Sequence, residues 1–274
     1  MTRILLNGHP TWVKMPKKKG RTLVLLHGGL SDSASMMRAV GPYLKEQFVL
    51  AAFDRRGHGR TADTDEPFSY DEMASETIAF IEELDRAVYL LGHSDGGNVA
   101  LIVAQRRPDL VRRVVVVGAN FHYDGLVPLD DFTPESEGFA EFAVDFSQHS
   151  PDGIEHASVV VQKSLELVKT QPTMSVDDLR AIVVPVLVMS GDDDVAQLTH
   201  TVAMFEAIPE AQLAVIPGAS HGVLKEQPKV CVRMIERFLL GPVPPETRAP
   251  LRRARPHGEQ RESRPEADPS VHLT

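Results

Sequence analysis

The sequence predicts an α/β fold in which a mostly parallel sheet is covered by helices on both faces. Two observations carry this prediction. Short apolar runs rich in Val and Leu recur along residues 1–240, and stretches with helical periodicity lie between them. Continuous apolar runs of this kind are typical of strands buried on both faces. Strands that alternate with helices in this way form parallel sheets.

Each element is expected from its own pattern. The apolar runs predict strands at 22–26, 48–53, 87–91, 114–117, 184–189 and 211–216. Apolar residues at helical spacing predict helices at 33–46, 70–83, 98–106, 198–207 and 230–239.

Residues 120–179 interrupt this alternation. Because a structureless loop of about 60 residues is improbable inside a compact domain, we expect a small helical cap over the sheet here. Three aromatic residues at helical spacing support the cap: Phe139, Phe142 and Phe146. A second apolar face is expected along 159, 160, 162, 165 and 168.

The chain therefore divides into three parts. Residues 1–119 and 180–240 are expected to form the core, with 120–179 inserted as the cap. Residues 241–274 contain seven prolines and no aromatic residue. Such a segment cannot bury enough apolar surface to offset its ordering entropy, so we expect a disordered tail.

Composition excludes several classes of protein. The 274 residues are 42% hydrophobic and 24% charged, which excludes a mainly disordered chain, a collagen-like fibre and a disulfide scaffold. A net charge of −9 argues against a nucleic-acid partner. No apolar run is long enough for a membrane-spanning helix, so we expect no membrane partner. The first residues also lack the pattern of a secretory signal. A single cysteine, Cys231, fits a reducing cytoplasm.

The strongest local motif follows the run at 87–91. Gly92-His93-Ser94-Asp95-Gly96 has the form G-x-S-x-G and lies between a predicted strand and a predicted helix. In that setting the motif indicates a nucleophile elbow, a tight turn that presents the Ser94 hydroxyl at a helix N-terminus. Glycine at 92 and 96 would remove side-chain collisions inside the turn.

A serine nucleophile requires a base, and the base requires a carboxylate. Of the 11 histidines, His221 stands out because it lies in a turn with Gly218 and Gly222 after the last predicted strand. Three acids, Asp192 to Asp194, follow the strand before it. The chain order serine, acid, histidine is that of one known fold.

The sequence resembles the α/β-hydrolase superfamily over roughly residues 20–239. Five motifs carry the resemblance: LVLLHGG (23–29), FDRRGHGRT (53–61), LGHSDGG (91–97), VLVMSGDDDV (186–195) and PGASHG (217–222). It implies a catalytic triad of Ser94, Asp194 and His221, with Asp192 and Asp193 left open as the acid. The S-D-G-G elbow is similar to that of valacyclovir hydrolase-like enzymes.

The same resemblance implies an oxyanion hole and an absence of cofactors. The backbone N–H of Asp95 and that of Gly29 or Leu30 would donate to the developing oxyanion. His27, His58 and His93 are expected to have structural roles. A serine at the elbow predicts acyl transfer, which needs neither a cofactor nor a metal.

The substrate is expected to be a small carboxylic ester or a related acyl compound. The side chain of Asp95 is a candidate for binding a substrate amine, and the cap supplies candidate substrate-binding aromatics: Phe121, Tyr123, Phe139 and Phe142. Lactones, amino-acid esters or amides, and carbon–carbon bonds remain open as alternative substrates of the same triad. A ligand-binding receptor on this fold, and a scaffold acting through the tail, are the non-enzymatic alternatives.

Overall fold

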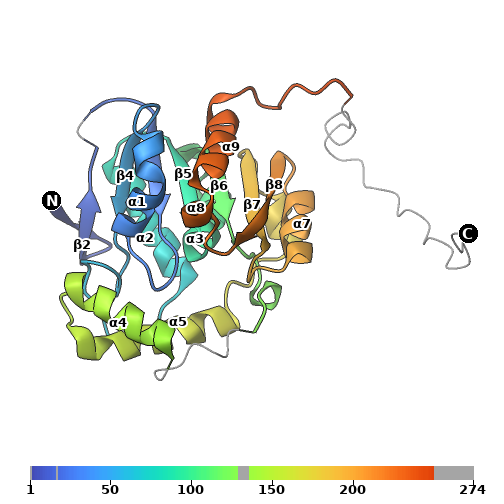
Figure 1. Ribbon diagram of the computed structural model, residues 1–274. Coiled ribbons are helices and arrows are strands. Elements are labelled where there is room, and N and C mark those ends of the chain that lie inside the picture. Colours follow the sequence, from blue (N-terminus) through green and yellow to red (C-terminus); the bar gives the residue numbers. More distant parts are fainter. Residues whose placement is uncertain (1, 17, 129–135, 250–274) are drawn as a thin grey trace, which may run out of the picture. The chain divides into compact units, whose positions relative to one another are not determined.

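The computed structural model describes residues 2–16, 18–128 and 136–249 and confirms the predicted fold (Figure 1). Its described part contains one sheet, made of β1 (Thr2–Leu6), β2 (His9–Lys14), β3 (Thr22–Leu26), β4 (Val49–Phe53), β5 (Val88–His93), β6 (Val111–Val117), β7 (Val186–Asp193) and β8 (Ala211–Ser220). The strands are ordered β1-β2-β4-β3-β5-β6-β7-β8. The pairs β1–β2 and β2–β4 are antiparallel, and the other pairs are parallel.

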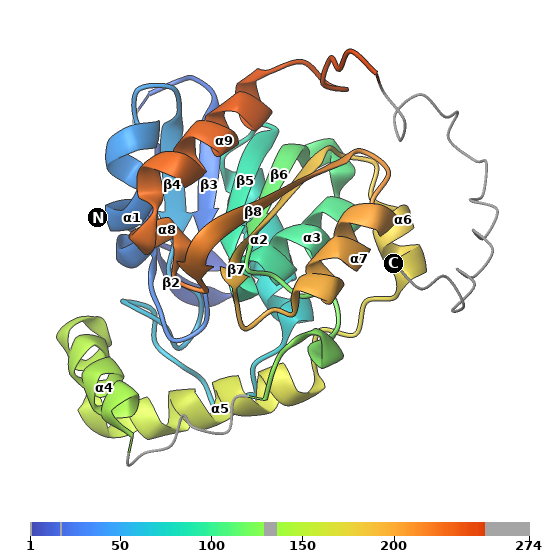
Figure 2. The same cartoon turned by 45° about the vertical axis from the view of Figure 1, so that its right-hand side comes forward.

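Helices cover both faces of the sheet, as Figures 1 and 2 show from two directions. One layer contains α1 (Ser33–Leu44), α8 (Val223–Glu226) and α9 (Pro228–Leu240), and the other contains α2 (Tyr70–Glu83), α3 (Asp95–Arg106) and α7 (Leu198–Ala207). Strand β3 shows how the sequence builds both layers. Val24 and Leu26 join the apolar cluster of α2 and α3, whereas Leu23 and Leu25 join that of α1 and α9.

The N-terminal hairpin was not predicted. Strands β1 and β2 are joined by Asn7 and Gly8, whose φ angles are +48° and +83°. An Asn-Gly pair between two apolar stretches is a strong hairpin signal, because both residues tolerate positive φ. Helix α3 also begins earlier than expected, at Asp95 rather than at residue 98.

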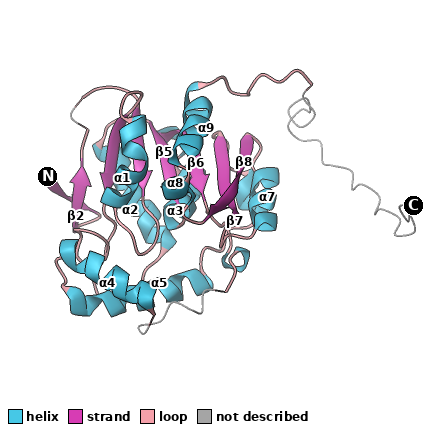
Figure 3. Ribbon diagram, viewed as in Figure 1, coloured by secondary structure: helices cyan, strands magenta, loops and turns pink. Residues whose placement is uncertain are grey.

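The described part of the cap is mostly helical, as the cyan ribbons of α4 and α5 in Figure 3 show. It contains α4 (Glu137–His149), α5 (Ala157–Thr170) and, near its end, the short α6 (Val176–Arg180). The expected face of α5 was wrong. Its buried residues are Ala157, Val160, Val161, Ser164 and Leu167. Of the expected face only Val160 is buried, because the stripe that packs on the core runs through 157, 160, 164 and 167.

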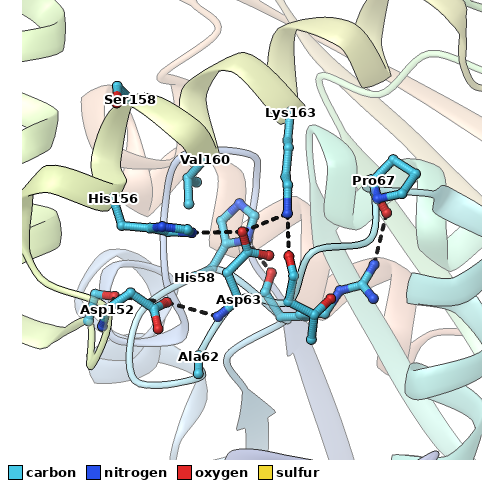
Figure 4. Close-up of polar contacts among 12 residues, drawn as sticks. His58, Ala62, Asp63, Pro67, Asp152, His156, Ser158, Val160 and Lys163 are labelled. Atoms are coloured by element: carbon cyan, nitrogen blue, oxygen red, sulfur yellow. Dashed lines mark hydrogen bonds and ion pairs between the residues drawn. The ribbon is translucent and has the colours of Figure 1, made fainter.

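Polar contacts hold α5 to the loop that follows β4 (Figure 4). The side chain of Asp63 is 1% exposed and accepts hydrogen bonds from Lys163 Nζ at 2.8 Å and His156 Nε2 at 2.9 Å. Lys163 also donates to the carbonyl oxygen of Thr64, and the N–H of Asp63 donates to a carboxylate oxygen of Asp152 at 2.8 Å. Three residues of the cap therefore converge on one buried aspartate of the core.

The predicted core and cap belong to one compact unit, Met1–Gly241. None of the helices in the described residues has the length and apolar character that a membrane crossing requires. Residues 250–274 of the predicted tail lie outside the described residues, so its disorder stays a prediction.

Candidate active site

The nucleophile elbow is formed where β5 ends and α3 begins. Ser94 has a φ of +52° and a ψ of −122°, a strained conformation for a residue with a side chain. A Cβ on Gly92 would lie 2.1 Å from the carbonyl oxygen of Gly96, and one on Gly96 would lie 2.2 Å from that of Leu26. Any side chain at either position would displace the backbone. The two glycines therefore permit the turn, as the sequence predicted.

Three predicted residues from three different loops meet beside this turn. His221 Nε2 lies 3.0 Å from Ser94 Oγ, and His221 Nδ1 lies 2.7 Å from Asp194 Oδ1. Ser94 follows β5, Asp194 follows β7 and His221 follows β8. Because the carboxyl ends of parallel strands meet at one edge of the sheet, residues more than 120 positions apart in sequence become neighbours.

The structure separates Asp194 from the two acids before it. Asp192 and Asp193 are exposed, and Asp192 Oδ1 accepts a hydrogen bond from the N–H of Ala219 at 3.2 Å. The side chain of Asp194 is 1% exposed. Burial opposes its ionisation, but hydrogen bonds from His221 and from the N–H of Ala196 hold its pKa below the ordinary value. Asp194 is therefore an anion beside the imidazole.

The loop that carries His221 is fixed by His93 and by a glycine. His93 Nε2 donates to the carbonyl oxygen of His221 at 2.8 Å. Burial and the neighbouring His221 lower the pKa of His93 to about 4, so His93 stays neutral at pH 7. Gly118 has a φ of +59°, and a Cβ there would lie 2.9 Å from His221 Nδ1. Sequence reasoning did not single out Gly118, although it follows directly after a predicted strand.

Two backbone N–H groups are available next to Ser94. Asp95 is the first residue of α3, and Leu30 lies in the loop after β3 with a φ of +49°. Among the described residues, neither N–H donates a hydrogen bond. The first N–H groups of a helix have no partner within the helix and carry its positive end. These are the groups that the sequence predicted for an oxyanion hole; Gly29 precedes Leu30 in the same loop.

A buried arginine braces that loop. Arg55 is 1% exposed, and its guanidinium donates to the carbonyl oxygens of His27 at 2.6 Å and Gly28 at 3.0 Å. The N–H of Arg55 donates to His27 Nε2 at 3.1 Å, while His27 Nδ1 donates to the Gly28 carbonyl at 2.8 Å. Burial, with the adjacent Arg55 cation, keeps the pKa of His27 well below its ordinary value. His27 thus has the bracing role predicted for it.

The carboxylate of Asp95 lies beneath the same loop. Asp95 is 6% exposed, and its Oδ1 accepts a hydrogen bond from the hydroxyl of Tyr70 at 2.7 Å. A Cβ on Gly29 would lie 2.6 Å from Asp95 Oδ2, so glycine at 29 leaves room for this carboxylate. Tyr70 and Arg55 therefore both lie next to the candidate site. The sequence did not predict either residue, because their burial depends on packing between segments far apart in the chain.

A cavity of about 260 Å³ adjoins the nucleophile. Ser94, His221, Gly29, Leu30 and Met36 are among the residues that line it. None of the predicted aromatic residues does so. Phe121 is buried and stacks on the ring of His200 at 3.9 Å, Phe139 and Phe142 pack against the apolar core, and Tyr123 is 36% exposed. Contact between these four and a substrate stays a prediction.

Comparison with known proteins identifies the family. A model described as the Alpha/beta hydrolase family matches residues 23–234. The chain belongs to this family. The fold and the superfamily expected from the five motifs are therefore confirmed.

The chain is similar in sequence to several hydrolases and haloperoxidases and in structure to a solved serine hydrolase. A non-heme haloperoxidase of Rhodococcus erythropolis is 29% identical over 242 residues, which cover 74% of this chain and 86% of the relative. The serine hydrolase BPHL of Mus musculus is 37% identical over 100 residues, or 35% of this chain and 33% of the relative. A solved serine hydrolase involved in carbazole degradation (the CarC enzyme) matches with a TM-score of 0.72 and 25% identity, covering 86% of this chain and 97% of that one.

Proposed function

We propose that this alpha/beta hydrolase cleaves small carboxylic esters through an acyl-enzyme formed on Ser94. One observation carries the proposal: the hydrogen-bonded series from Ser94 Oγ through His221 to Asp194, with distances of 3.0 and 2.7 Å. A nucleophile, a base and an acid that orients the base are the three groups that acyl transfer requires. Leu30 lines the same cavity as Ser94, and Asp95 follows Ser94 in the chain.

The steps follow from this geometry. His221 Nε2 accepts the Ser94 proton while Oγ attacks the carbonyl carbon, and the N–H groups of Leu30 and Asp95 stabilise the oxyanion that forms. Asp194 holds Nδ1 protonated and stabilises the imidazolium. The ester C–O bond then breaks, and the His221 imidazolium protonates the departing alkoxide oxygen, which leaves the acyl group on Ser94 Oγ. Water gives a proton to the same histidine as it attacks the acyl carbon. The bond to Ser94 Oγ breaks, Oγ takes the proton back from His221, and the carboxylic acid is released.

The contacts of Asp95 favour simple esters over amino-acid esters. One carboxylate oxygen is engaged by Tyr70, and the residue is 6% exposed. Such a carboxylate is poorly placed to meet a substrate ammonium. We therefore expect kcat/KM for an amino-acid ester to exceed that for its N-acetyl form by less than about tenfold, because a desolvated ion pair would contribute more.

Ser94→Ala tests the proposal directly. Hydrolysis of 4-nitrophenyl acetate should fall to the background rate in the Ser94→Ala variant, whose fold should be intact by circular dichroism. Ser75→Ala is the matched control, since Ser75 is an exposed serine on α2 whose hydroxyl donates to the carbonyl oxygen of Asp71 at 2.9 Å. A Ser94→Ala enzyme that retains turnover would exclude this mechanism.

A further inference from the structure

A second cavity continues from the one beside Ser94. It has a volume of about 420 Å³. The two cavities share four lining residues: Ser35, Ala39, Leu224 and Lys225. Because one set of side chains forms the border of both, the space beside the nucleophile extends as a trench along α1. We call this continuation the α1 trench.

The walls of the α1 trench come from two packed helical segments. Ser35, Ala39 and Pro42 lie at positions i, i+4 and i+7 of α1, so they share one helix face. Their small side chains leave room above that face, which runs for about 10 Å at 1.5 Å per residue. The opposite wall is formed by Leu224 of α8 and Pro228 at the start of α9, and both helices contact α1 (Figure 2).

Two of the residues that line the trench are cations, and one of them, Lys225, also lines the cavity beside Ser94. Arg38 of α1 and Lys225 of α8 both line the trench and are both exposed. Neither forms an ion pair or a side-chain hydrogen bond with any described residue. The chain as a whole carries a net charge of −9. Two unpaired cations facing one trench are therefore a local feature that opposes the charge of the molecule.

Residues that come shortly after His221 connect the cavity beside the nucleophile with the trench. Gly222, Leu224 and Lys225 line the first cavity, and Leu224 and Lys225 also line the trench. In acyl transfer the base returns its proton to the leaving group, so that group must lie against the imidazole. A leaving group that extends beyond His221 along α8 enters the trench and approaches the two cations.

We propose that the preferred substrates are esters whose leaving group has an apolar body and ends in a carboxylate bound by Arg38 and Lys225. The apolar body lies between Ala39, Pro42 and Leu224. This inference rests on the proposed function, because it assigns a specificity to the same nucleophile.

Two substrates that differ only in charge test the proposal. These are 3-(4-acetoxyphenyl)propanoate and 3-(4-acetoxyphenyl)propanamide, which release the same acetyl group from phenols of matched size. We expect a kcat/KM about tenfold higher for the carboxylate, since two partly solvated ion pairs contribute modestly. In about 1 M salt, where the screening length is about 3 Å, this preference should largely vanish.

Variants assign the effect to the two cations. The double variant Arg38→Gln, Lys225→Gln should hydrolyse both substrates at about equal efficiency, so the ratio of the two kcat/KM values should fall from about ten to about one. Lys45→Gln is the matched control: it removes an exposed cation at the end of α1 that does not line the trench, and it should keep the preference. Equal rates in the wild type, or a preference that survives the double variant, would overturn this inference and leave the esterase proposal standing.

A binding measurement separates this inference from the proposed function. The phenol 3-(4-hydroxyphenyl)propanoate should bind to the Ser94→Ala protein more tightly than its amide, by calorimetry or NMR titration, and the double variant should lose the difference. If the wild type hydrolyses neither ester, the proposed function fails, and the binding result alone decides whether the trench holds an anion. No binding difference would refute the anion site.

Discussion

At the scale of single residues, the candidate site depends on a few contacts that sequence motifs point to and on others that they cannot. The motifs predicted Ser94, Asp194 and His221, because elbow, acid and base each follow a recognisable strand in a fixed chain order. They did not predict Arg55 or Tyr70. In the sequence Arg55 looks like any charged loop residue. Its guanidinium is buried because α2 and the loop after β3 pack around it.

Asp194→Asn should lower kcat for ester hydrolysis about a thousandfold or more, because an amide no longer fixes the imidazole tautomer or stabilises the imidazolium. Asp193→Asn is the matched control, since Asp193 is exposed and has no bond to His221. Steady-state kinetics on 4-nitrophenyl acetate measures both variants. A larger loss in Asp193→Asn would assign the acid to a different position.

Arg55→Met should lower kcat about a hundredfold with little change in KM. The loss of the guanidinium frees the carbonyls of His27 and Gly28, so the N–H of Leu30 is no longer held for the oxyanion. Arg56→Met is the control, since Arg56 bonds the carbonyl of Pro67 and pairs with Glu72 outside the site. Thermal melting separates misfolding from loss of activity. A folded Arg55→Met protein with wild-type kcat would remove Arg55 from the site.

At the scale of elements, the sequence predicted six strands and five core helices but missed the β1–β2 hairpin and the buried face of α5. The hairpin carried an Asn-Gly signal, but its strands are partly exposed and lack a continuous apolar run. The face of α5 could not be predicted from apolar spacing alone. Exposed Val159 and half-buried Val168 are apolar, whereas the buried stripe includes Ser164, which bonds the carbonyl of Val160.

The contacts of Asp63 should hold α5 against the core. Lys163→Met removes the ammonium group from a carboxylate that is 1% exposed, so we expect the free energy of unfolding to fall by about 2 kcal/mol. Arg180→Met removes an exposed pair with Asp177 and should change stability by less than about 0.5 kcal/mol. Urea unfolding measures both, and equal stabilities of the two variants would show that Asp63 does not anchor the cap.

At the scale of the whole molecule, buried neutral histidines couple stability to pH. Burial, reinforced by the Arg55 cation, lowers the pKa of His58 to about 4, whereas an unfolded histidine titrates near about 6.5. Between these values the unfolded chain binds a proton that the folded chain excludes. The free energy of unfolding therefore falls as the pH is lowered from about 6.5 towards 4, by about 1.4 kcal/mol per pH unit for each such histidine.

Urea unfolding at pH 7 and at pH 5 measures this coupling. The wild type should be less stable at pH 5, and His58→Gln should show a shallower dependence because one excluded proton is gone. Glutamine retains a donor for the carbonyl of Arg56, which His58 Nδ1 bonds at 2.9 Å. Equal unfolding free energies at the two pH values would contradict a neutral buried histidine at this position.

An activated serine reacts with a fluorophosphonate, so labelling with this reagent tests whether Ser94 is a nucleophile. Intact-protein mass spectrometry followed by peptide mapping reports how many groups attach and where. We expect a single phosphonyl group on Ser94, which would be absent from Ser94→Ala and strongly slowed in His221→Gln. A folded protein that gains no adduct, or gains one at another residue, would contradict the proposed mechanism.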